Sequence, residues 1–223
     1  MPRTPPRLCL VTDRRRLASF RGVGDVDALA VRALVDQASE AAEAGIDIIQ
    51  LRERDLEAGA LLALTSRVLE AVAGRAAVVV NDRLDVALAA GADGIQLPER
   101  GLSPERVRVV APGGFIVGRS VHGVLDGATG RDVDYLVFGT VFQSRSKPHG
   151  GPPAGIDGLR RACRAVAVPV LAIGGVGLDE VAAVAEAGAA GLAAIDLFLT
   201  EPGGLHRIAL AIRRRFDSPE PVS

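Results

Sequence analysis

Short runs of apolar residues recur along the chain, and each is flanked by polar or glycine-containing segments. The runs are largely continuous rather than alternating, which is the pattern of strands that are buried on both faces of a parallel sheet. Eight runs have this form, at residues 8–12, 46–51, 77–81, 94–97, 115–120, 135–138, 170–173 and 192–195. The hydrophobic pattern therefore predicts eight parallel strands.

Amphipathic, often alanine-rich segments lie between these strands. Three of them end in a glycine, at Gly45, Gly91 and Gly188, and the next apolar run begins within a few residues. Glycine readily takes the left-handed conformation that ends a helix, so each of these positions is a stop signal. Helices are predicted at residues 27–44, 58–73, 83–90, 104–110, 124–131, 157–167, 178–187 and 204–214.

Alternation of eight strands with eight helices favours a closed (β/α)8 barrel. An open doubly wound sheet is the alternative, but it more often has fewer strands, and no G-x-G-x-x-G motif follows the first predicted strand. We expect one barrel domain at residues 7–216, with flexible tails at residues 1–6 and 217–223.

Composition narrows the range of functions. The chain of 223 residues has a formal net charge of −1 and an aromatic fraction of 3%, which argues against a nucleic-acid partner. No apolar stretch approaches membrane-spanning length or the form of a signal peptide, so we expect no membrane partner. Cys9 and Cys163 lack metal-binding or redox spacing and are expected to be small core residues, as in a cytoplasmic protein.

The active face of such a barrel is formed by the carboxyl ends of its strands and the loops that follow them. Polar residues at those positions are Thr12, Asp13, Gln50, Arg52, Arg54, Asn81, Asp82, Gln96, Glu99, Arg100, Arg119, Ser120, His122, Thr140 and Asp196. Loops are generally polar, but this set concentrates cations, amides and hydroxyls, which are groups that bind phosphate oxygens.

Two loops add to this picture. Of 26 Lys and Arg residues only Lys147 is a lysine, and it lies in the sequence SRSKP at residues 144–148. A compact ammonium on a flexible stem suits a phosphate that moves during a reaction, although an ordinary loop cation is the alternative. The loop at residues 140–156 is long enough to be a lid. Gly174 and Gly175 follow the seventh strand, where bare backbone N–H groups often bind phosphate.

The motifs together resemble the thiamine phosphate synthase and TenI superfamily. They are QLRER at residues 50–54, ND at 81–82, GRSVH at 118–122, FGTVF at 138–142, SRSK at 144–147 and AIGG at 172–175. The resemblance implies a (β/α)8 barrel. Synthases of this superfamily join a hydroxymethylpyrimidine pyrophosphate to a thiazole phosphate and release pyrophosphate, whereas TenI-type members aromatise a thiazole carboxylate phosphate tautomer.

The resemblance also implies roles for individual residues. Those implied to hold the pyrimidine and its pyrophosphate are Gln50, Arg52, Arg54, Asn81, Ser120, Ser144, Ser146 and Lys147. Arg54 stands where the synthases usually have lysine. Asp82 would hold Mg²⁺ beside the pyrophosphate, and Gly174 and Gly175 would hold the thiazole phosphate.

Two positions depart from the synthase pattern. Gly101, in the sequence PERG at residues 98–101, replaces the aspartate that completes the Mg²⁺ site. Glu99 could compensate, or Arg100 beside it could instead supply positive charge directly. Asp196 replaces a serine that normally contacts the thiazole phosphate, and a carboxylate there repels a phosphate unless a cation intervenes.

The missing Mg²⁺ ligand at Gly101 favours a TenI-like thiazole tautomerase that needs no cofactor. Its predicted catalytic residues are His122, which would move the proton near neutral pH, Ser120 and Lys147. An imidazole that caps a following helix is the structural alternative for His122. The alternative functions are a Mg²⁺-dependent thiamine phosphate synthase and a non-catalytic barrel that binds a phosphorylated metabolite. The expected partners are a small phosphorylated heterocycle and further copies of the chain in a homo-oligomer.

Overall fold

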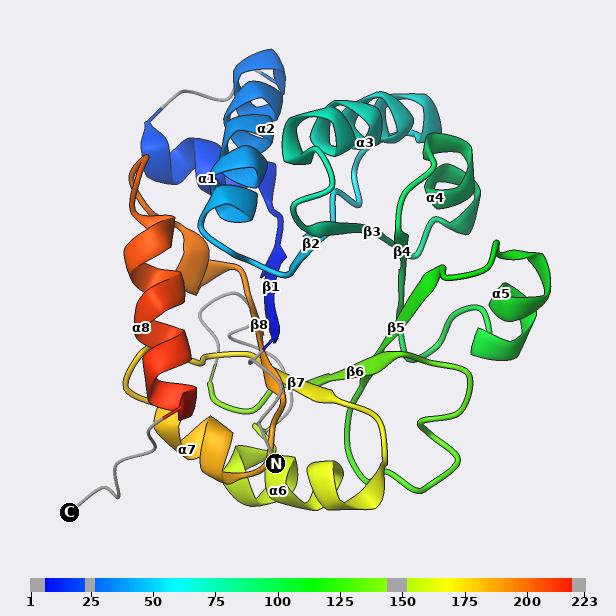
Figure 1. Cartoon of the computed structure of the whole chain (residues 1–223), viewed down its shortest axis with the longest axis vertical. Helices are drawn as coiled ribbons and strands as arrows, with labels where there is room; N and C mark the ends of the chain where they lie inside the picture. The colour runs from blue at the N-terminus through cyan, green and yellow to red at the C-terminus, as the bar shows by residue number, and fades with distance from the viewer. Residues whose placement is uncertain (1–6, 23–26, 144–151, 218–223) are drawn as a thin grey trace.

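The computed structural model describes residues 7–22, 27–143 and 152–217, and these residues form a closed eight-stranded barrel (Figure 1). Each strand pairs in parallel with the next, and the last pairs with the first, with Cys9 opposite Ala193. The strands are β1 (Arg7–Val11), β2 (Ile48–Leu51), β3 (Ala77–Asn81), β4 (Gly94–Leu97), β5 (Ile116–Val121), β6 (Tyr135–Gly139), β7 (Val170–Ile173) and β8 (Gly191–Ala194). The predicted (β/α)8 barrel is confirmed.

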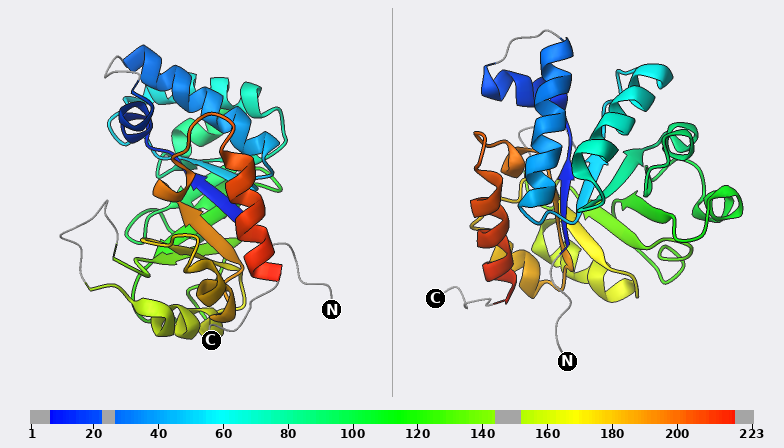
Figure 2. Two further views of the ribbon diagram at one scale, coloured as in Figure 1. Left: turned by 90° about the vertical axis from the view of Figure 1, so that its left-hand side faces the viewer. Right: turned by 45° about the horizontal axis from the view of Figure 1, so that its top comes forward.

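Helices surround the strands on the outside of the barrel (Figures 1 and 2). They are α1 (Arg14–Arg21), α2 (Asp27–Glu43), α3 (Ala58–Val72), α4 (Leu84–Ala90), α5 (Pro104–Val110), α6 (Gly155–Ala165), α7 (Val181–Glu186) and α8 (Leu205–Asp217), with a short 3₁₀ helix η1 (Asp196–Phe198). Helix α8 includes Asp217, one residue beyond the predicted end of the barrel domain at residue 216. Of the tails expected at residues 1–6 and 217–223, all residues but Asp217 lie outside the described residues.

Two helix predictions were wrong. Residues 124–131 form no helix, because Gly127 and Gly130 break the pattern and the Asp126 carboxylate instead accepts the backbone N–H groups of Ala128 and Thr129 at 3.1 and 3.0 Å. Helix α1 was not predicted at all. The Asp13 carboxylate caps it by accepting the N–H of Arg16 at 3.0 Å.

The core has two layers, one inside the barrel and one between the strands and the helices. Cys9 lies in the inner layer with no exposed surface, and burial raises the pKa of its thiol to about 12. Burial also raises the pKa of Cys163 to about 11. Both cysteines are free thiols; Cys9 is a core residue, as predicted, whereas Cys163 is only partly buried and packs against the core.

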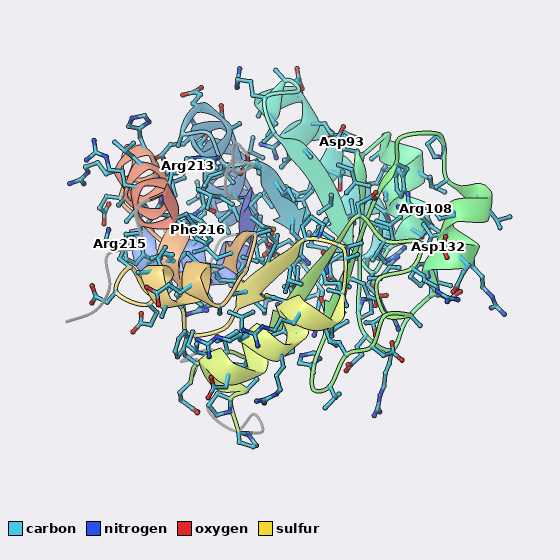
Figure 3. All side chains as sticks on the ribbon, turned by 60° about the horizontal axis from the view of Figure 1, so that its bottom comes forward. Asp93, Arg108, Asp132, Arg213, Arg215 and Phe216 are labelled. Atoms are coloured by element: carbon cyan, nitrogen blue, oxygen red, sulfur yellow. The ribbon has the colours of Figure 1, made fainter. Side chains whose placement is uncertain are left out.

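Aspartates fix the register at the amino ends of the strands. Asp47, Asp93 and Asp134 each precede a strand, and each carboxylate accepts a backbone N–H of the preceding strand at 2.7 to 2.8 Å. Arginines join this end of the barrel to the helices: Arg213 contacts Asp47, and Arg108 contacts Asp134 and the carbonyl of Asp132 (Figure 3). Polar interactions at this end therefore stabilise the fold.

Among the described residues, no helix combines the length and the apolar character that crossing a membrane requires.

Candidate functional site

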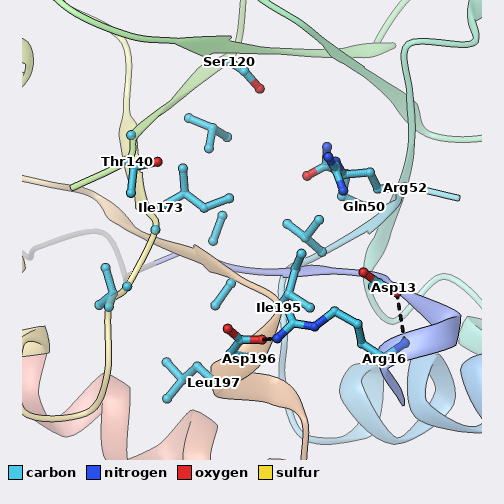
Figure 4. A pocket seen from close by; sticks show the side chains of 18 of the residues that line it. Asp13, Arg16, Gln50, Arg52, Ser120, Thr140, Ile173, Ile195, Asp196 and Leu197 are labelled. Carbon is cyan, nitrogen blue, oxygen red and sulfur yellow. Dashed lines mark hydrogen bonds and ion pairs between the residues drawn. The ribbon is translucent and has the colours of Figure 1, made fainter. Parts of the chain in front are cut away.

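A cavity of about 900 Å³ opens at the carboxyl ends of the strands. Residues from or just after every strand of the barrel contribute to its wall, and Figure 4 shows eighteen of their side chains. Predicted site residues in this wall are Gln50, Arg52, Arg54, Asn81, Ser120, His122, Gly174 and Gly175. The barrel therefore brings together side chains that are more than 120 positions apart in the sequence.

The remaining predicted site residues are not in the described wall. Ser144, Ser146 and Lys147 lie outside the described residues, as does the middle of the loop predicted to be a lid, residues 144–151. Both described ends of that loop are fixed, because Ala154 N–H donates to Thr140 O at 2.9 Å and Gly155 N–H donates to Val141 O at 3.0 Å. Asp82 follows Asn81 directly but is not among the residues that line the cavity.

The end of β2 supplies the cationic part of the wall. Gln50 is buried and donates through Nε2 to the Asn81 side-chain oxygen at 3.3 Å, which ties β2 to β3. Burial lowers the pKa of Arg52, and the nearby charge of Arg54 lowers it further. Two cations held this close together favour binding of a multiply charged anion.

A buried polar network supports this loop, and sequence reasoning missed it. The Glu53 carboxylate accepts the Thr12 hydroxyl at 2.6 Å and the Arg14 guanidinium at 3.1 Å. The Thr12 oxygen in turn accepts the backbone N–H of Arg52 at 3.0 Å. Arg14 also forms two 2.7 Å contacts with Asp55. Only the position of Thr12 at a strand end gave a signal for this network.

Polar side chains also form the floor of the barrel interior. Gln96 is fully buried and donates through Nε2 to the Ser120 hydroxyl at 3.0 Å. Gly118 lies opposite, where an added Cβ would come within 2.3 Å of Gln96 Oε1 and of the Tyr135 ring. The floor is therefore closely packed, and Ser120 is held by a neighbour from β4.

His122 is oriented by Glu99. One Glu99 oxygen accepts the His122 backbone N–H at 3.0 Å, and the other lies 3.1 Å from Nδ1. Burial acts to raise the pKa of Glu99, but the hydrogen bonds from His122 outweigh it and the pKa lies below its usual value. Because residues 124–131 form no helix, the helix-capping interpretation of His122 was wrong.

The carboxylates near the strand ends decide whether a metal ion has ligands here. Glu99 has both oxygens engaged by His122, and an added Cβ at Gly101 would lie 2.8 Å from Pro98 Cγ. Across the described part of the chain, no three His, Cys, Asp or Glu side chains are grouped to hold a metal ion. Mg²⁺ often takes only one or two protein carboxylates and completes its shell with substrate phosphates. Asp82, the carboxylate predicted for this role, directly follows the wall residue Asn81 but does not itself line the cavity.

The carboxyl ends of β7 and β8 form the other side of the cavity. Gly174 and Gly175 have φ angles of 97° and 63°, and a Cβ at either would lie within 2.5 Å of Thr140 or Gln143. Both positions therefore require glycine. Asp196 lines the cavity, where Arg16 of α1 forms an ion pair with it (Figure 4). A cation thus intervenes at the carboxylate that was expected to repel a phosphate.

The sequence of the chain is similar to that of known proteins. Residues 23–198 match the family described as thiamine monophosphate synthase. The thiamine-phosphate synthase of Anaeromyxobacter dehalogenans (strain 2CP-C) is 45% identical over 168 residues, which cover 74% of this chain and 75% of that protein. That of Methanoculleus marisnigri is 38% identical over 187 residues, covering 82% and 88%.

A solved structure agrees with the sequence comparisons. The thiamine phosphate pyrophosphorylase from Pyrococcus furiosus superposes with a TM-score of 0.75 at 28% identity, and the match covers 95% of each chain. The apo homocysteine methyltransferase MmuM from Escherichia coli, at 14% identity and a TM-score of 0.61, is similar in fold alone.

Proposed function

Because the chain belongs to the thiamine monophosphate synthase family, we propose that it is a thiamine phosphate synthase. It would join a hydroxymethylpyrimidine pyrophosphate to a thiazole phosphate and release pyrophosphate. The chain is an enzyme, so the non-catalytic alternative is excluded.

The prediction of a TenI-like tautomerase was wrong. The relatives that match this chain at 45% and 38% identity are named thiamine-phosphate synthases. The departure at Gly101 led to the wrong prediction, because it was interpreted as the loss of metal-dependent chemistry. His122 then loses the role of proton shuttle, since the condensation makes and breaks no bond to hydrogen in either heterocycle.

The observation that supports the proposal is one cavity with two regions suited to anions. Arg52 and Arg54 are at the end of β2, while Gly174 and Gly175 follow β7, and Arg16 from α1 pairs with Asp196 after the neighbouring β8. The first region suits a pyrophosphate, and the second suits the phosphate of a thiazole. A site for two phosphorylated substrates needs both regions in one cavity.

The chemical step consists of one bond exchange. The C–O bond between the pyrimidine methylene carbon and pyrophosphate breaks, and its electron pair leaves with the pyrophosphate. The thiazole nitrogen supplies the electron pair of the new C–N bond and becomes a thiazolium. The bond exchange takes place between the two substrates and needs no covalent bond to the protein. Catalysis therefore depends on orientation of the two substrates and on stabilisation of the leaving group's charge.

Different residues of the cavity wall would stabilise the leaving group and orient the substrates. Arg52 and Arg54 would stabilise the charge that develops on the departing pyrophosphate, and the Thr12 contact fixes the backbone of Arg52. Gln50, Asn81 and Ser120 would orient the pyrimidine end. Asp82 is the residue that would hold Mg²⁺ together with pyrophosphate oxygens, where the ion would neutralise charge on the leaving group.

A direct assay tests the proposal. The purified chain is incubated with both substrates in Mg²⁺, and thiamine phosphate is quantified by chromatography. We expect product with Mg²⁺ and its loss when EDTA is added. Absence of product, under conditions in which a known thiamine-phosphate synthase is active, would overturn the proposal.

A further inference from the structure

An ion pair joins two elements that meet at the cavity wall. Arg16 lies in the first turn of α1, and Asp196 is the first residue of η1, directly after β8 and Ile195. Arg16 Nη2 contacts the Asp196 carboxylate, and both side chains line the same cavity as Gly174 and Gly175 (Figure 4). Because β8 pairs with β7, whose end carries Gly174 and Gly175, Asp196 lies on the side of the cavity that suits the thiazole phosphate.

The backbone of Arg16 is firmly held. Its N–H donates to the Asp13 carboxylate at 3.0 Å, and the neighbouring Leu17 and Ala18 are buried against the core. Arg14, two residues earlier, is 2% exposed and bound by Asp55 and Glu53. Helix α1 therefore fixes the base of the Arg16 side chain and leaves the guanidinium to extend along the wall.

The guanidinium has donors to spare. The Asp196 carboxylate contacts Nη2 of Arg16. Nη1 of Arg16 is shielded from solvent and has no hydrogen-bond acceptor among the described residues. An unsatisfied donor of this kind costs free energy until an acceptor arrives. A phosphate oxygen is the acceptor that arginine binds best, because the planar fork can make two parallel contacts.

Stability alone gives a weak reason for the pair. The side chains are 34% and 43% exposed, and ion pairs with that much exposure contribute little to folding. Asp196 accepts hydrogen bonds but cannot donate them, so it cannot contact a phosphate itself. Asp196 is instead placed to hold the Arg16 guanidinium, and the positive charge of Arg16 offsets the negative charge of the carboxylate.

We propose that Arg16 determines specificity for the phosphate group of the thiazole substrate and that Asp196 positions its guanidinium. This inference rests on the proposed function and deepens it. The ligand chemistry is a phosphate monoester on a small heterocycle. The Arg16 guanidinium from α1 would make the contact with the phosphate that the Asp196 carboxylate cannot make.

Binding measurements test this directly and do not depend on turnover. Thiazole phosphate and the corresponding unphosphorylated thiazole alcohol are titrated by calorimetry into the parent and Arg16→Gln. We expect the parent to prefer the phosphate and Arg16→Gln to bind it about 10- to 100-fold more weakly, with alcohol binding unchanged. Arg16→Lys should recover part of the loss, because it keeps the charge.

Controls separate binding from folding. Arg160→Gln removes a surface arginine that pairs with Asp157 on α6, outside the cavity, and should bind both ligands as the parent does. Asp196→Ala introduced into Arg16→Gln should tighten phosphate binding relative to Arg16→Gln, because the carboxylate there has lost its counter-ion. Equal thermal melting of the variants would show that the fold is intact.

Kinetics separate this inference from the proposed function. If the parent makes thiamine phosphate, Arg16→Gln should raise KM for thiazole phosphate by a similar factor and leave KM for the pyrimidine pyrophosphate within about twofold. If the parent makes no product but shows Arg16-dependent phosphate preference, only the proposed function fails. An unchanged phosphate preference in Arg16→Gln would overturn the inference.

Discussion

At the scale of single residues, Arg52 is the cation whose loss should affect the chemistry most. It lines the cavity, its backbone is fixed by Thr12, and Arg54 provides a second charge beside it. We expect Arg52→Ala to lower kcat/KM for the pyrimidine pyrophosphate about 100-fold or more, because leaving-group charge is then poorly stabilised. Steady-state kinetics measure this, and Arg160→Ala provides the control. Activity of Arg52→Ala close to that of the parent would contradict the assignment.

Gly101 allows a second test at this scale. A Cβ at this position would lie 2.8 Å from Pro98 Cγ, so Gly101→Asp alone should lower the free energy of unfolding by about 1–3 kcal/mol through steric strain. Combining it with Pro98→Gly removes the ring and should recover most of the loss. Urea unfolding of the single and double variants measures this, and equal stability of Gly101→Asp and the parent would show that the two positions are not linked.

Individual site residues were predictable to the extent that they end a strand. Gln50, Asn81 and Ser120 were found because polar residues after buried strands gather at one rim. Arg16 and Glu53 were missed, since their roles depend on which side chains they meet in space. Asp196 was singled out from the resemblance as a departure, but its neutralising partner comes from a helix that the sequence pattern did not predict.

At the scale of elements, aspartates such as Asp93 keep the strands in register. Its carboxylate accepts the buried N–H of Val78 at 2.8 Å, and Asp93→Ala would leave that donor without this acceptor. We expect a loss of about 1–3 kcal/mol in the free energy of unfolding. Chemical denaturation measures this, and the exposed Asp157→Ala should change stability by less than about 0.5 kcal/mol. Equal effects of the two variants would contradict this account of Asp93.

The link between α1 and the loop after β2 should depend on pH. The hydrogen bond from Arg14 lowers the pKa of Asp55 to about 2 from 3.8. A carboxyl whose pKa is lower in the folded state stabilises the fold above its unfolded pKa, and this stabilisation is lost as the pH falls toward the folded value. The stability difference between the parent and Asp55→Asn should therefore be constant above about pH 5 and shrink from pH 4 to pH 2.

The size of this effect should be modest, about 1 kcal/mol, because Asp55 is 39% exposed and solvent screens the pair. Urea unfolding at several pH values measures it. A difference that stays constant down to pH 2 would show that the Asp55 charge does not stabilise this link.

The elements themselves followed closely from hydrophobic pattern, since all eight strands lie within a few residues of the predicted positions. The failures have specific causes. Residues 124–131 have helical spacing, but Gly127, Gly130 and the Asp126 turn prevail locally. Helix α1 begins with three consecutive arginines, which conceal the apolar positions Leu17 and Ala18 that it buries.

At the scale of the whole molecule, the barrel topology creates the site. Closure between β8 and β1 brings Arg16 and Asp196 together across 180 positions of sequence, and the same closure sets β2 and β7 on one cavity. The expected homo-oligomer stays a prediction. Barrel closure could be predicted from the number of strands, but the partners within the cavity depend on side-chain directions that only the folded chain defines.

The cavity at the carboxyl ends of the strands is proposed to bind and join two phosphorylated substrates. The most direct measurement is ³¹P NMR of one reaction containing the purified chain, Mg²⁺, the pyrimidine pyrophosphate and the thiazole phosphate. We expect thiamine phosphate and pyrophosphate to appear in equal amounts, and we expect neither to form when the thiazole phosphate is omitted. Release of pyrophosphate without the thiazole phosphate, or no reaction with both substrates present, would contradict this proposal.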